Sequence, residues 1–294
     1  MSGQTFGGEW TEVKLNRLKS YLEAYRTIFN RNSQARFYTT WYVDAFAGTG
    51  SRSAPEAIGL DLGLLSEEDD EDVRQYKDGS AKIALALKEP FDRYLFVEKS
   101  KGKCDALQAT INEEFTSLKD RCNIRQDDSN VALCAWCSER DWTRERAVVF
   151  LDPFGLQVEW TTIASLGSTK AVDLWYLFPL NLLRMLKRDG VIEDRWKQRL
   201  DKLFGTPDWE SRIYRVGTSQ SLFGEVATVE RDATVENVQG FIEERLATCF
   251  ARVAKGEVLR NSRNSPLYSL CFAAANEKGA RTAIKIAQSI LKGT

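Results

Sequence analysis

Short apolar runs rich in β-branched and aromatic residues alternate with segments of helical spacing, and this alternation limits the possible folds more than any other feature. The runs typical of strands cover residues 37–43, 94–97, 123–125, 147–151 and 171–178. The segments of helical spacing between them cover residues 81–88, 105–118, 131–139 and 161–166. Strands that alternate with helices predict an α/β fold with a parallel, doubly wound sheet. Two later runs, 256–260 and 267–275, predict an antiparallel hairpin, and residues 279–291 predict a final helix.

The segments around this core predict one domain with additions. Apolar residues at helical spacing near the N-terminus predict an amphipathic helix, so residues 1–36 are expected to form a tail and a helix packed on the core. Residues 37–294 would then form one Rossmann-like domain. Within it we expect an insertion at 52–78, whose acidic run is typical of solvated segments, and a helical insertion at about 180–250. Ser80 is expected to be the N-cap of the helix that follows it.

Composition and cysteine spacing exclude several classes of protein. The 294 residues are 43% hydrophobic, and no apolar run approaches the roughly 20 residues that span a bilayer, so we expect a soluble, cytoplasmic protein without a membrane segment. The six cysteines lack the spacing of a disulfide framework. Cys134 and Cys137 form a single CxxC without the second ligand pair of a zinc knuckle, so we expect no metal site. The chain contains no histidine, which excludes a histidine general base and a Ser-His-Asp triad.

Each of the first four predicted strands is closed by an acidic residue, and an open α/β sheet binds its ligand at these strand ends. Asp44 precedes a turn whose glycines let a ligand approach the backbone. Glu98 is placed to accept hydrogen bonds from a ribose diol, and Asp127 or Asp128 to accept one from the exocyclic amine of adenine. The residues expected to bind a cofactor are Asp44, Phe46, Ala47, Gly48, Thr49, Gly50, Ser80, Glu98, Lys99, Asp127 and Asp128.

The glycine turn favours one class of cofactor. A phosphate-binding loop is expected to carry a lysine, which this turn lacks, and a carboxylate just before the glycines repels a pyrophosphate. The turn suits an ammonium or sulfonium next to an adenosine, a description that S-adenosylmethionine meets. Taken alone, it also fits an ordinary connection that needs glycine for backbone geometry. A nucleotide-binding dehydrogenase is a weaker alternative, because Asp44 occupies the space that a pyrophosphate needs.

The fourth strand is followed by Asp152, Pro153, Phe154 and Gly155. Asp-Pro is also a common way to begin a turn after a strand. In a cofactor site, Asp152 and a backbone oxygen would accept hydrogen bonds from an exocyclic amine, and Phe154 would stack on a flat substrate. Such bonds favour the positive charge that develops on the nitrogen in the transition state. We expect Asp152, Pro153 and Phe154 to be the catalytic residues, and this chemistry needs no histidine.

The motifs resemble those of a known family, and they span nearly the whole chain in order. They are Trp10 with Lys14 and Leu15 ahead of Tyr21 and Leu22, then residues 44–50, 78–80, Ala84 and Leu85, 96–99, 151–155, 266–268, and Phe272 with Ala273. With these residues the chain resembles class I S-adenosylmethionine-dependent methyltransferases, and more narrowly the three-Cys-motif partner protein (TcmP) family.

This resemblance implies a mostly parallel seven-stranded sheet, of Rossmann-like class I methyltransferase fold, with a C-terminal antiparallel hairpin and added helices. It also implies S-adenosylmethionine as cofactor and a partner protein that carries a three-cysteine, radical-enzyme-like motif. Asp-Pro-Phe-Gly is similar to the motif of tRNA guanine-N2 methyltransferases. Amino methyltransferases of nucleobases usually have Asp-Pro-Pro-Tyr, from which Phe154 and Gly155 depart, and the identity of the base stays open.

A nucleic-acid substrate predicts a basic surface, although the net charge of the chain is −1. Basic residues gather after the fifth strand and in the hairpin loop, but interleaved acidic residues also fit a solvated helix face. The resemblance places Lys14 near the site, whereas helical spacing alone fits a solvated lysine. A non-catalytic partner protein that keeps the nucleoside pocket is the alternative function. The residues expected to contact substrate are Lys14, Gly155, Arg184, Arg260 and Arg263.

Overall fold

A seven-stranded sheet forms the centre of the structure, a computed structural model that describes residues 9–48, 79–186, 190, 192–221 and 224–293. The strands are β1 (Thr39–Asp44), β2 (Arg93–Glu98), β3 (Cys122–Gln126), β4 (Glu145–Leu151), β5 (Val172–Pro179), β8 (Arg252–Arg260) and β9 (Pro266–Ala274). Their order across the sheet is β3-β2-β1-β4-β5-β9-β8. Neighbours among β1 to β5 pair in parallel, and β9 is antiparallel to both β5 and β8. This is the strand order of the class I methyltransferase fold, so the predicted fold class is confirmed.

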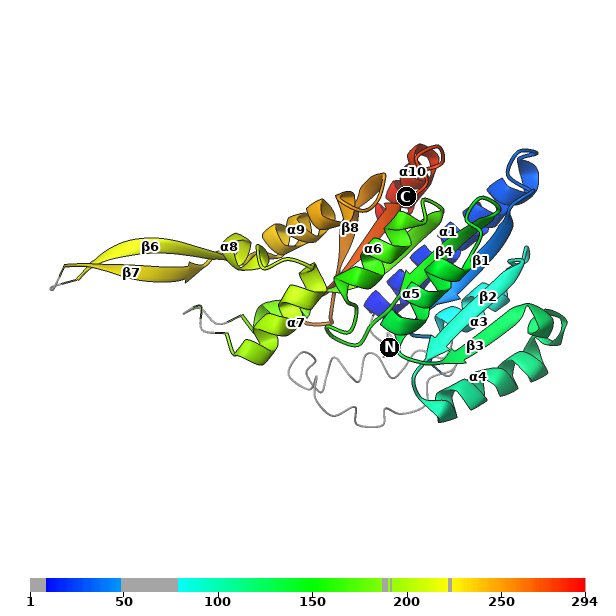
Figure 1. The fold of residues 1–294 in the computed structure, drawn as a ribbon, viewed down its shortest axis with the longest axis horizontal. Coiled ribbons are helices and arrows are strands. Elements are labelled where there is room, and N and C mark those ends of the chain that lie inside the picture. Colours follow the sequence, from blue (N-terminus) through cyan, green and yellow to red (C-terminus); the bar gives the residue numbers. More distant parts are fainter. Residues whose placement is uncertain (1–8, 49–78, 187–189, 191, 222–223, 294) are drawn as a thin grey trace, which may run out of the picture.

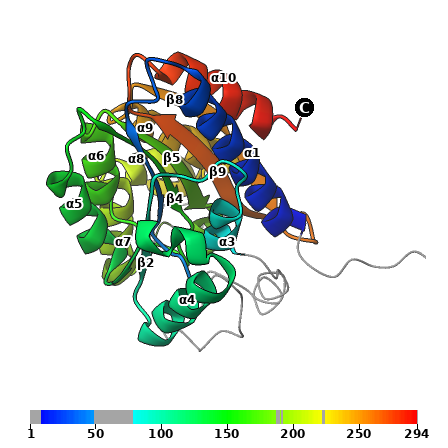
Figure 2. The ribbon, with the colours of Figure 1, turned by 90° about the vertical axis from the view of Figure 1, so that its right-hand side faces the viewer.

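Helices cover both faces of the sheet (Figures 1 and 2). The first face packs against α5 (Ser129–Glu139), α6 (Trp160–Ser168) and α9 (Val235–Ala247). The second face packs against α1 (Glu9–Arg31), α3 (Ser80–Leu85), α4 (Lys101–Glu114) and α10 (Ala280–Leu291). Side chains alternate between the two cores along a strand, so Tyr42 lies in the α1 core and its neighbour Val43 in the α5 core. Burial on both faces explains why the parallel strands are apolar along most of their length.

Helix α1 crosses the sheet from its carboxyl edge to its amino edge. Near its start, Trp10 stacks on Tyr268 at the beginning of β9, with ring centroids 5.3 Å apart. Leu18, Tyr21 and Leu22 are buried against the sheet, as the amphipathic pattern predicted. One helix thus contributes side chains to both edges of the sheet.

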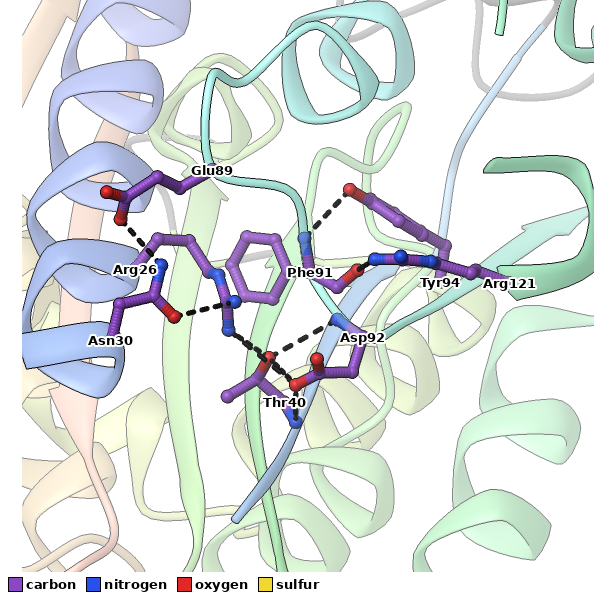
Figure 3. Close-up of polar contacts among 8 residues, drawn as sticks. All are labelled: Arg26, Asn30, Thr40, Glu89, Phe91, Asp92, Tyr94 and Arg121. Carbon is purple, nitrogen blue, oxygen red and sulfur yellow. Dashed lines mark hydrogen bonds and ion pairs between the residues drawn. The ribbon is translucent and has the colours of Figure 1, made fainter. Parts of the chain in front are cut away.

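Polar contacts fix the far end of α1 at the amino edge (Figure 3). The guanidinium of Arg26 donates to the hydroxyl of Thr40 in β1 and lies 3.7 Å from the Asp92 carboxylate. Asp92 also accepts from the Thr40 amide at 2.8 Å and from its hydroxyl at 2.6 Å. Asn30 donates to Glu89 at 2.7 Å. These bonds join α1, β1 and the segment before β2.

Residues 180–250 are helical only in part, so the predicted helical insertion is wrong for its middle. The elements between β5 and α9 are η2 (Leu180–Arg184), α7 (Asp194–Phe204), α8 (Trp209–Ile213), β6 (Tyr214–Ser221) and β7 (Gly224–Arg231). Strands β6 and β7 form a separate antiparallel ribbon that extends away from the body (Figure 1). The run Val-Ala-Thr-Val at 226–229 has the β-branched composition of a strand. Arg231 anchors the base of the ribbon by donating to the carbonyls of Leu183 and Leu186, at 3.0 and 2.8 Å.

Candidate cofactor and substrate site

The turn after β1 lies between the carboxyl ends of the neighbouring strands. The Ala45 amide donates to the Phe150 carbonyl of β4, and the Ala47 amide to the Val97 carbonyl of β2, both at 3.2 Å. Gly48 has a φ of +60°, the left-handed region in which a side chain is strained, and no atom lies within 4 Å of the place where its Cβ would be. The turn therefore needs glycine here for its backbone conformation and leaves space beside it. Thr49, Gly50 and the insertion at 52–78 lie outside the described residues.

Glu98 at the end of β2 is held by two backbone amides. Its Oε2 accepts from the Gly48 amide at 3.1 Å, and its Oε1 accepts from the Ser100 amide at 2.9 Å. Each carboxylate oxygen has a second lone pair, so both can also accept from the hydroxyls of a ribose. The two amides hold the Glu98 carboxylate, which the sequence predicts to bind a ribose diol, in one orientation. Through the Gly48 amide, this carboxylate also positions the glycine turn.

A cleft of about 650 Å³ opens at this edge, beside the turn and the start of α5. Phe46, Glu98, Lys99, Asp128 and Phe154 all line it, so five predicted site residues from four separate segments come together. Ala47, Asp127 and Ser80 are not among its lining residues. Arg199 and Lys202, which belong to the basic cluster noted after the fifth strand, also line it. Sequence reasoning missed the other lining residues, which are Ala45, Val97, Ser100, Lys103, Ser129, Asn130, Leu156, Gln157 and Glu159.

The two aspartates after β3 have local structural roles. Asp128 is the N-cap of α5, and its Oδ1 accepts from the amides of Asn130 and Val131, at 2.9 and 3.5 Å. The exposed Asp127 accepts from the Asp128 amide at 2.7 Å. Their predicted contact with an adenine amine stays a prediction. Asp128 lies where the start of α5 opens on the cleft.

Asn130 joins α5 to the loop that follows β4. Its amide donates to the Gln157 carbonyl at 2.9 Å, and its Oδ1 accepts from the Glu159 amide at 2.9 Å and from the Thr162 hydroxyl at 2.8 Å. The half-buried side-chain amide of Asn130 thus bonds to the loop both as a donor and as an acceptor. These three bonds fix the loop that carries Phe154. No sequence motif indicates a contact between residues 27 or more positions apart.

Asp44 points to the α1 side of the sheet and is fully buried. Its Oδ1 accepts from the Phe46 amide at 3.2 Å, and its Oδ2 accepts from the hydroxyls of Ser80 at 2.5 Å and Tyr42 at 3.3 Å. The prediction that Ser80 is the N-cap of α3 is therefore wrong. Gly79 is the N-cap, and the Ser80 side chain bonds to Asp44 instead. Burial raises the pKa of Asp44 to about 6, the Asp152 charge adds to the rise, and the bonds from Ser80 and Phe46 oppose it.

This shift predicts how stability depends on pH. Because the pKa of Asp44 is higher in the folded than in the unfolded chain, its contribution is most favourable below pH 4 and is lost as the pH rises through about 6. At about 1.4 kcal/mol per pKa unit, the loss is about 3 kcal/mol. We expect the free energy of unfolding of Asp44→Asn to fall less between pH 4 and pH 7 than that of the wild type, by about this amount, in urea titrations. Asp127→Asn is the exposed control, and parallel curves for Asp44→Asn and wild type would contradict the shift.

Lys14 and Asp152 form an ion pair across the carboxyl edge. The ammonium lies 2.5 Å from Oδ2 of Asp152, with the Lys14 side chain only 2% exposed and that of Asp152 21% exposed. The ammonium also lies 5.0 Å from the centre of the Trp10 ring. The expectation of a solvated lysine is wrong. Lys14 is four residues after Trp10 and four before Leu18, so it belongs to the buried stripe of α1, a spacing that the sequence already contained.

The loop after Asp152 places one aromatic ring at the cleft. Pro153 and Gly155 are buried, and Gly155 adopts a φ of +70°. Phe154 is 41% exposed, and its amide donates to the Gln157 side chain at 3.2 Å. A large apolar ring held at the rim of a cleft is suited to stacking on a flat ligand.

The predicted substrate-binding arginines lie at the same edge but do not line the cleft. Pro179 at the end of β5 pairs with Tyr268, so the loop that carries Arg263 follows the carboxyl end of the sheet. Arg260 donates to the Asn264 carbonyl within that loop at 3.0 Å. Arg184 ends η2. The basic residues that do line the cleft are Arg199 and Lys202 of α7, Lys103 of α4, and Lys99 in the loop between β2 and α4.

The sequence predicts no disulfides, no metal site and no membrane segment. All six cysteines are free thiols, and burial raises the pKa of Cys137 to about 12, as for a small apolar side chain rather than a metal ligand. Over the described ranges, no cluster of three or more ligating side chains could hold a metal ion. In the same part of the chain, no helix has the length and apolar character needed to cross a membrane.

Comparisons with known proteins return solved structures alone: no family model and no curated protein matches the chain. A Legionella pneumophila protein of the DUF519 family is 13% identical over 84% of this chain and 94% of that chain, with a TM-score of 0.40. A provisionally assigned S-adenosylmethionine-dependent methyltransferase of Listeria monocytogenes is 9% identical over 87% and 98%, with a TM-score of 0.35. An O-methyltransferase of Bacillus cereus in complex with SAH is 11% identical over 72% and 78%, with a TM-score of 0.32. The fold assignment rests on the strand order and register described above.

Proposed function

We propose that this chain is an S-adenosylmethionine-dependent methyltransferase. The proposal rests on one observation: a cleft at the carboxyl ends of β1 and β2 contains an ordered carboxylate, Glu98, beside a glycine turn with free space, and an aromatic ring, Phe154. A cleft of about 650 Å³ falls within the usual range for cofactor sites. Glu98 would bind the ribose hydroxyls, and Phe46 would pack against the adenosine. Bound S-adenosylmethionine would supply an electrophilic methyl group.

The residues after β4 would orient the acceptor. Asp152 would accept a hydrogen bond from an amino group, and the Pro153 carbonyl a second one, so that the nitrogen lone pair points to the methyl carbon. Transfer forms the nitrogen–carbon bond and breaks the carbon–sulfur bond, and the nitrogen then gives up one proton to water. Asp152 stabilises the positive charge that develops on the nitrogen. Lys14 would hold the Asp152 carboxylate in one orientation.

We propose a nucleobase amino group as the acceptor. Phe154 offers a face for a flat ring, and Lys99, Lys103, Arg199 and Lys202 put positive charge around the cleft, where it would meet phosphates. Glu159 pairs with Lys202 at 2.9 Å and offsets part of this charge. A base in a duplex would have to be flipped out of the stack, so an unpaired site in RNA or DNA is favoured.

A non-catalytic role is the second candidate, and the Lys14–Asp152 pair is the observation that favours it. A carboxylate already bonded to a buried ammonium has less capacity to bind a substrate amine. In this case the chain would bind the cofactor or a nucleoside and would act through a partner protein, for which the three-Cys-motif protein is our candidate.

Mass spectrometry of nucleosides from cells with and without the protein separates the two functions. A methyltransferase predicts a methylated nucleoside that disappears without the protein and does not return with Asp152→Ala. The non-catalytic role predicts identical nucleosides in all three samples, together with unchanged binding of S-adenosylhomocysteine by Asp152→Ala.

Replacing Glu98 by glutamine should weaken the binding of S-adenosylhomocysteine about 10- to 100-fold. A hydrogen bond to a charged group contributes about 1.5–3 kcal/mol, and glutamine also places an amide donor where Glu98 accepts. The measurement is isothermal titration calorimetry. Glu139→Gln is the matched control, since Glu139 is an exposed glutamate of α5 paired with Arg125. Equal affinities for Glu98→Gln and Glu139→Gln would contradict the assignment of the diol.

A further inference from the structure

A second cavity, of about 610 Å³, lies at the amino edge of the sheet, opposite the cofactor cleft. Arg146 and Asp173, the second residues of β4 and β5, both line it, which fixes its position at the strand beginnings. The other lining residues used below are Tyr21, Tyr25 and Phe29 of α1, Tyr38 before β1, Lys170 before β5, and Glu277 and Lys278 before α10. None of these residues has a role in the proposed reaction.

Asp173 provides a polar anchor inside this cavity. Its Oδ2 accepts from the hydroxyl of Tyr21 at 2.7 Å. Burial raises the pKa of Asp173 to about 7, while the bond from Tyr21 and the charge of Arg146 oppose the rise. A carboxyl group that is half protonated near neutral pH can accept from one N–H group and donate to a neighbouring ring nitrogen. Aminated nitrogen heterocycles present this pair of groups on one edge.

The walls of the cavity are flat. The Arg146 guanidinium lies over the Tyr38 ring, 3.8 Å from its centre, and donates to the carbonyls of Trp142 and Glu145 at 2.8 and 2.6 Å. The rings of Tyr25 and Phe29 stack with centroids 4.5 Å apart. Tyr38 and Phe29 are both half-buried, so their surfaces are partly accessible. An arginine plane and aromatic rings together suit the face of a heterocycle.

The charges around the cavity argue against a cationic ligand. Arg146, Lys170 and Lys278 are the basic lining residues, and Asp173 and Glu277 are the acidic ones. Lys170 and Glu277 lie 3.9 Å apart at the rim, so they largely offset each other. The remaining charge is positive or neutral, which favours a neutral or anionic ligand over an amine.

We propose that this cavity binds a nucleoside or a nucleoside monophosphate. The amino-bearing edge of the base bonds to Asp173, its face stacks beside Tyr38 and Arg146, and Lys278 lies at the rim for a phosphate. The volume is in the range that holds ligands of this size. The site is separate from the cofactor cleft, and α1 contributes residues to both edges.

The test is isothermal titration calorimetry with adenosine, cytidine, AMP and inorganic phosphate as probes, in the presence of saturating S-adenosylhomocysteine. Asp173→Ala removes both the acceptor and the donor that face the base, and Tyr38→Ala removes a half-buried stacking surface without touching Asp173. We expect millimolar or tighter binding of AMP or of a nucleoside, weakened at least about tenfold in both variants and unchanged in Glu98→Gln. If AMP binds more tightly than adenosine, the basic rim contributes to binding. If AMP and adenosine bind equally tightly, the cavity recognises the nucleoside alone.

Three results would overturn the proposal. The first is no binding of any nucleoside or of AMP at millimolar concentration. The second is equal affinity in wild type, Asp173→Ala and Tyr38→Ala. The third is inorganic phosphate binding as tightly as AMP. Glu98 lies in the cofactor cleft and not in this cavity. The expected affinities of the wild type and the variants therefore do not depend on the proposed methyltransferase function.

Discussion

Replacing Asp152 by asparagine is expected to lower the rate of methyl transfer about 100- to 1,000-fold, as for the loss of one group that stabilises charge in a transition state. Asparagine keeps the size of the side chain but removes the negative charge that faces the developing positive charge on the nitrogen. The assay measures transfer of labelled methyl from S-adenosylmethionine to nucleic acid purified from cells that lack the protein. Binding of S-adenosylhomocysteine should stay within about threefold, because Asp152 does not line the cofactor cleft.

Asp105→Asn is the matched control for this experiment, since Asp105 is an exposed aspartate of α4 and does not line the cleft. It should retain most of the activity. Full activity of Asp152→Asn would exclude Asp152 from the chemistry, whereas no transfer by the wild type would favour the non-catalytic role.

The Lys14–Asp152 pair is expected to show an asymmetric effect on stability. Asp152→Asn leaves a 2% exposed ammonium without this counter-ion, and loss of one partner of a buried pair costs about 3–5 kcal/mol. Lys14→Met should cost less, because Asp152 is 21% exposed and water can solvate its carboxylate. The double variant, Lys14→Met with Asp152→Asn, should recover much of the stability lost in Asp152→Asn. Urea unfolding of all four proteins gives the coupling energy as a double-mutant cycle.

A second cycle on Lys101 and Asp105 is the control, since this exposed pair lies on α4 with its charged atoms 3.5 Å apart. It should show no measurable coupling. Additive effects of Lys14→Met and Asp152→Asn would mean that the two side chains do not interact in solution. The double variant also separates folding from function, because it should be stable and still inactive.

The sheet and its binding edge could be predicted because periodicity and strand ends are local properties of the sequence. The alternation of apolar runs with helical segments predicted the strands, and Glu98 and Phe154 were placed in one cleft from their positions alone. Lys14 was also placed near the site, but only by the resemblance to a family. Its burial follows from its position in the buried stripe of α1, and a helix projection of the sequence would have indicated this burial.

The missed features depend on contacts between distant segments. Serine is a residue type common at N-caps, yet the Ser80 hydroxyl donates to Asp44, 36 positions earlier. Asn130 fixes the loop after β4 through three bonds that no local pattern predicts. The strands β6 and β7 lie within the region predicted to be helical, although the run at 226–229 has the composition of a strand, and they pair with each other rather than with the main sheet.

The most direct test of the methyltransferase proposal is calorimetric titration of the purified protein with S-adenosylhomocysteine. We expect one site per chain with micromolar affinity, the usual range for cofactor and substrate affinities of enzymes. Binding should be weakened by Glu98→Gln and unchanged by Asp173→Asn at the opposite edge. No binding of either S-adenosylhomocysteine or S-adenosylmethionine would contradict the proposed function.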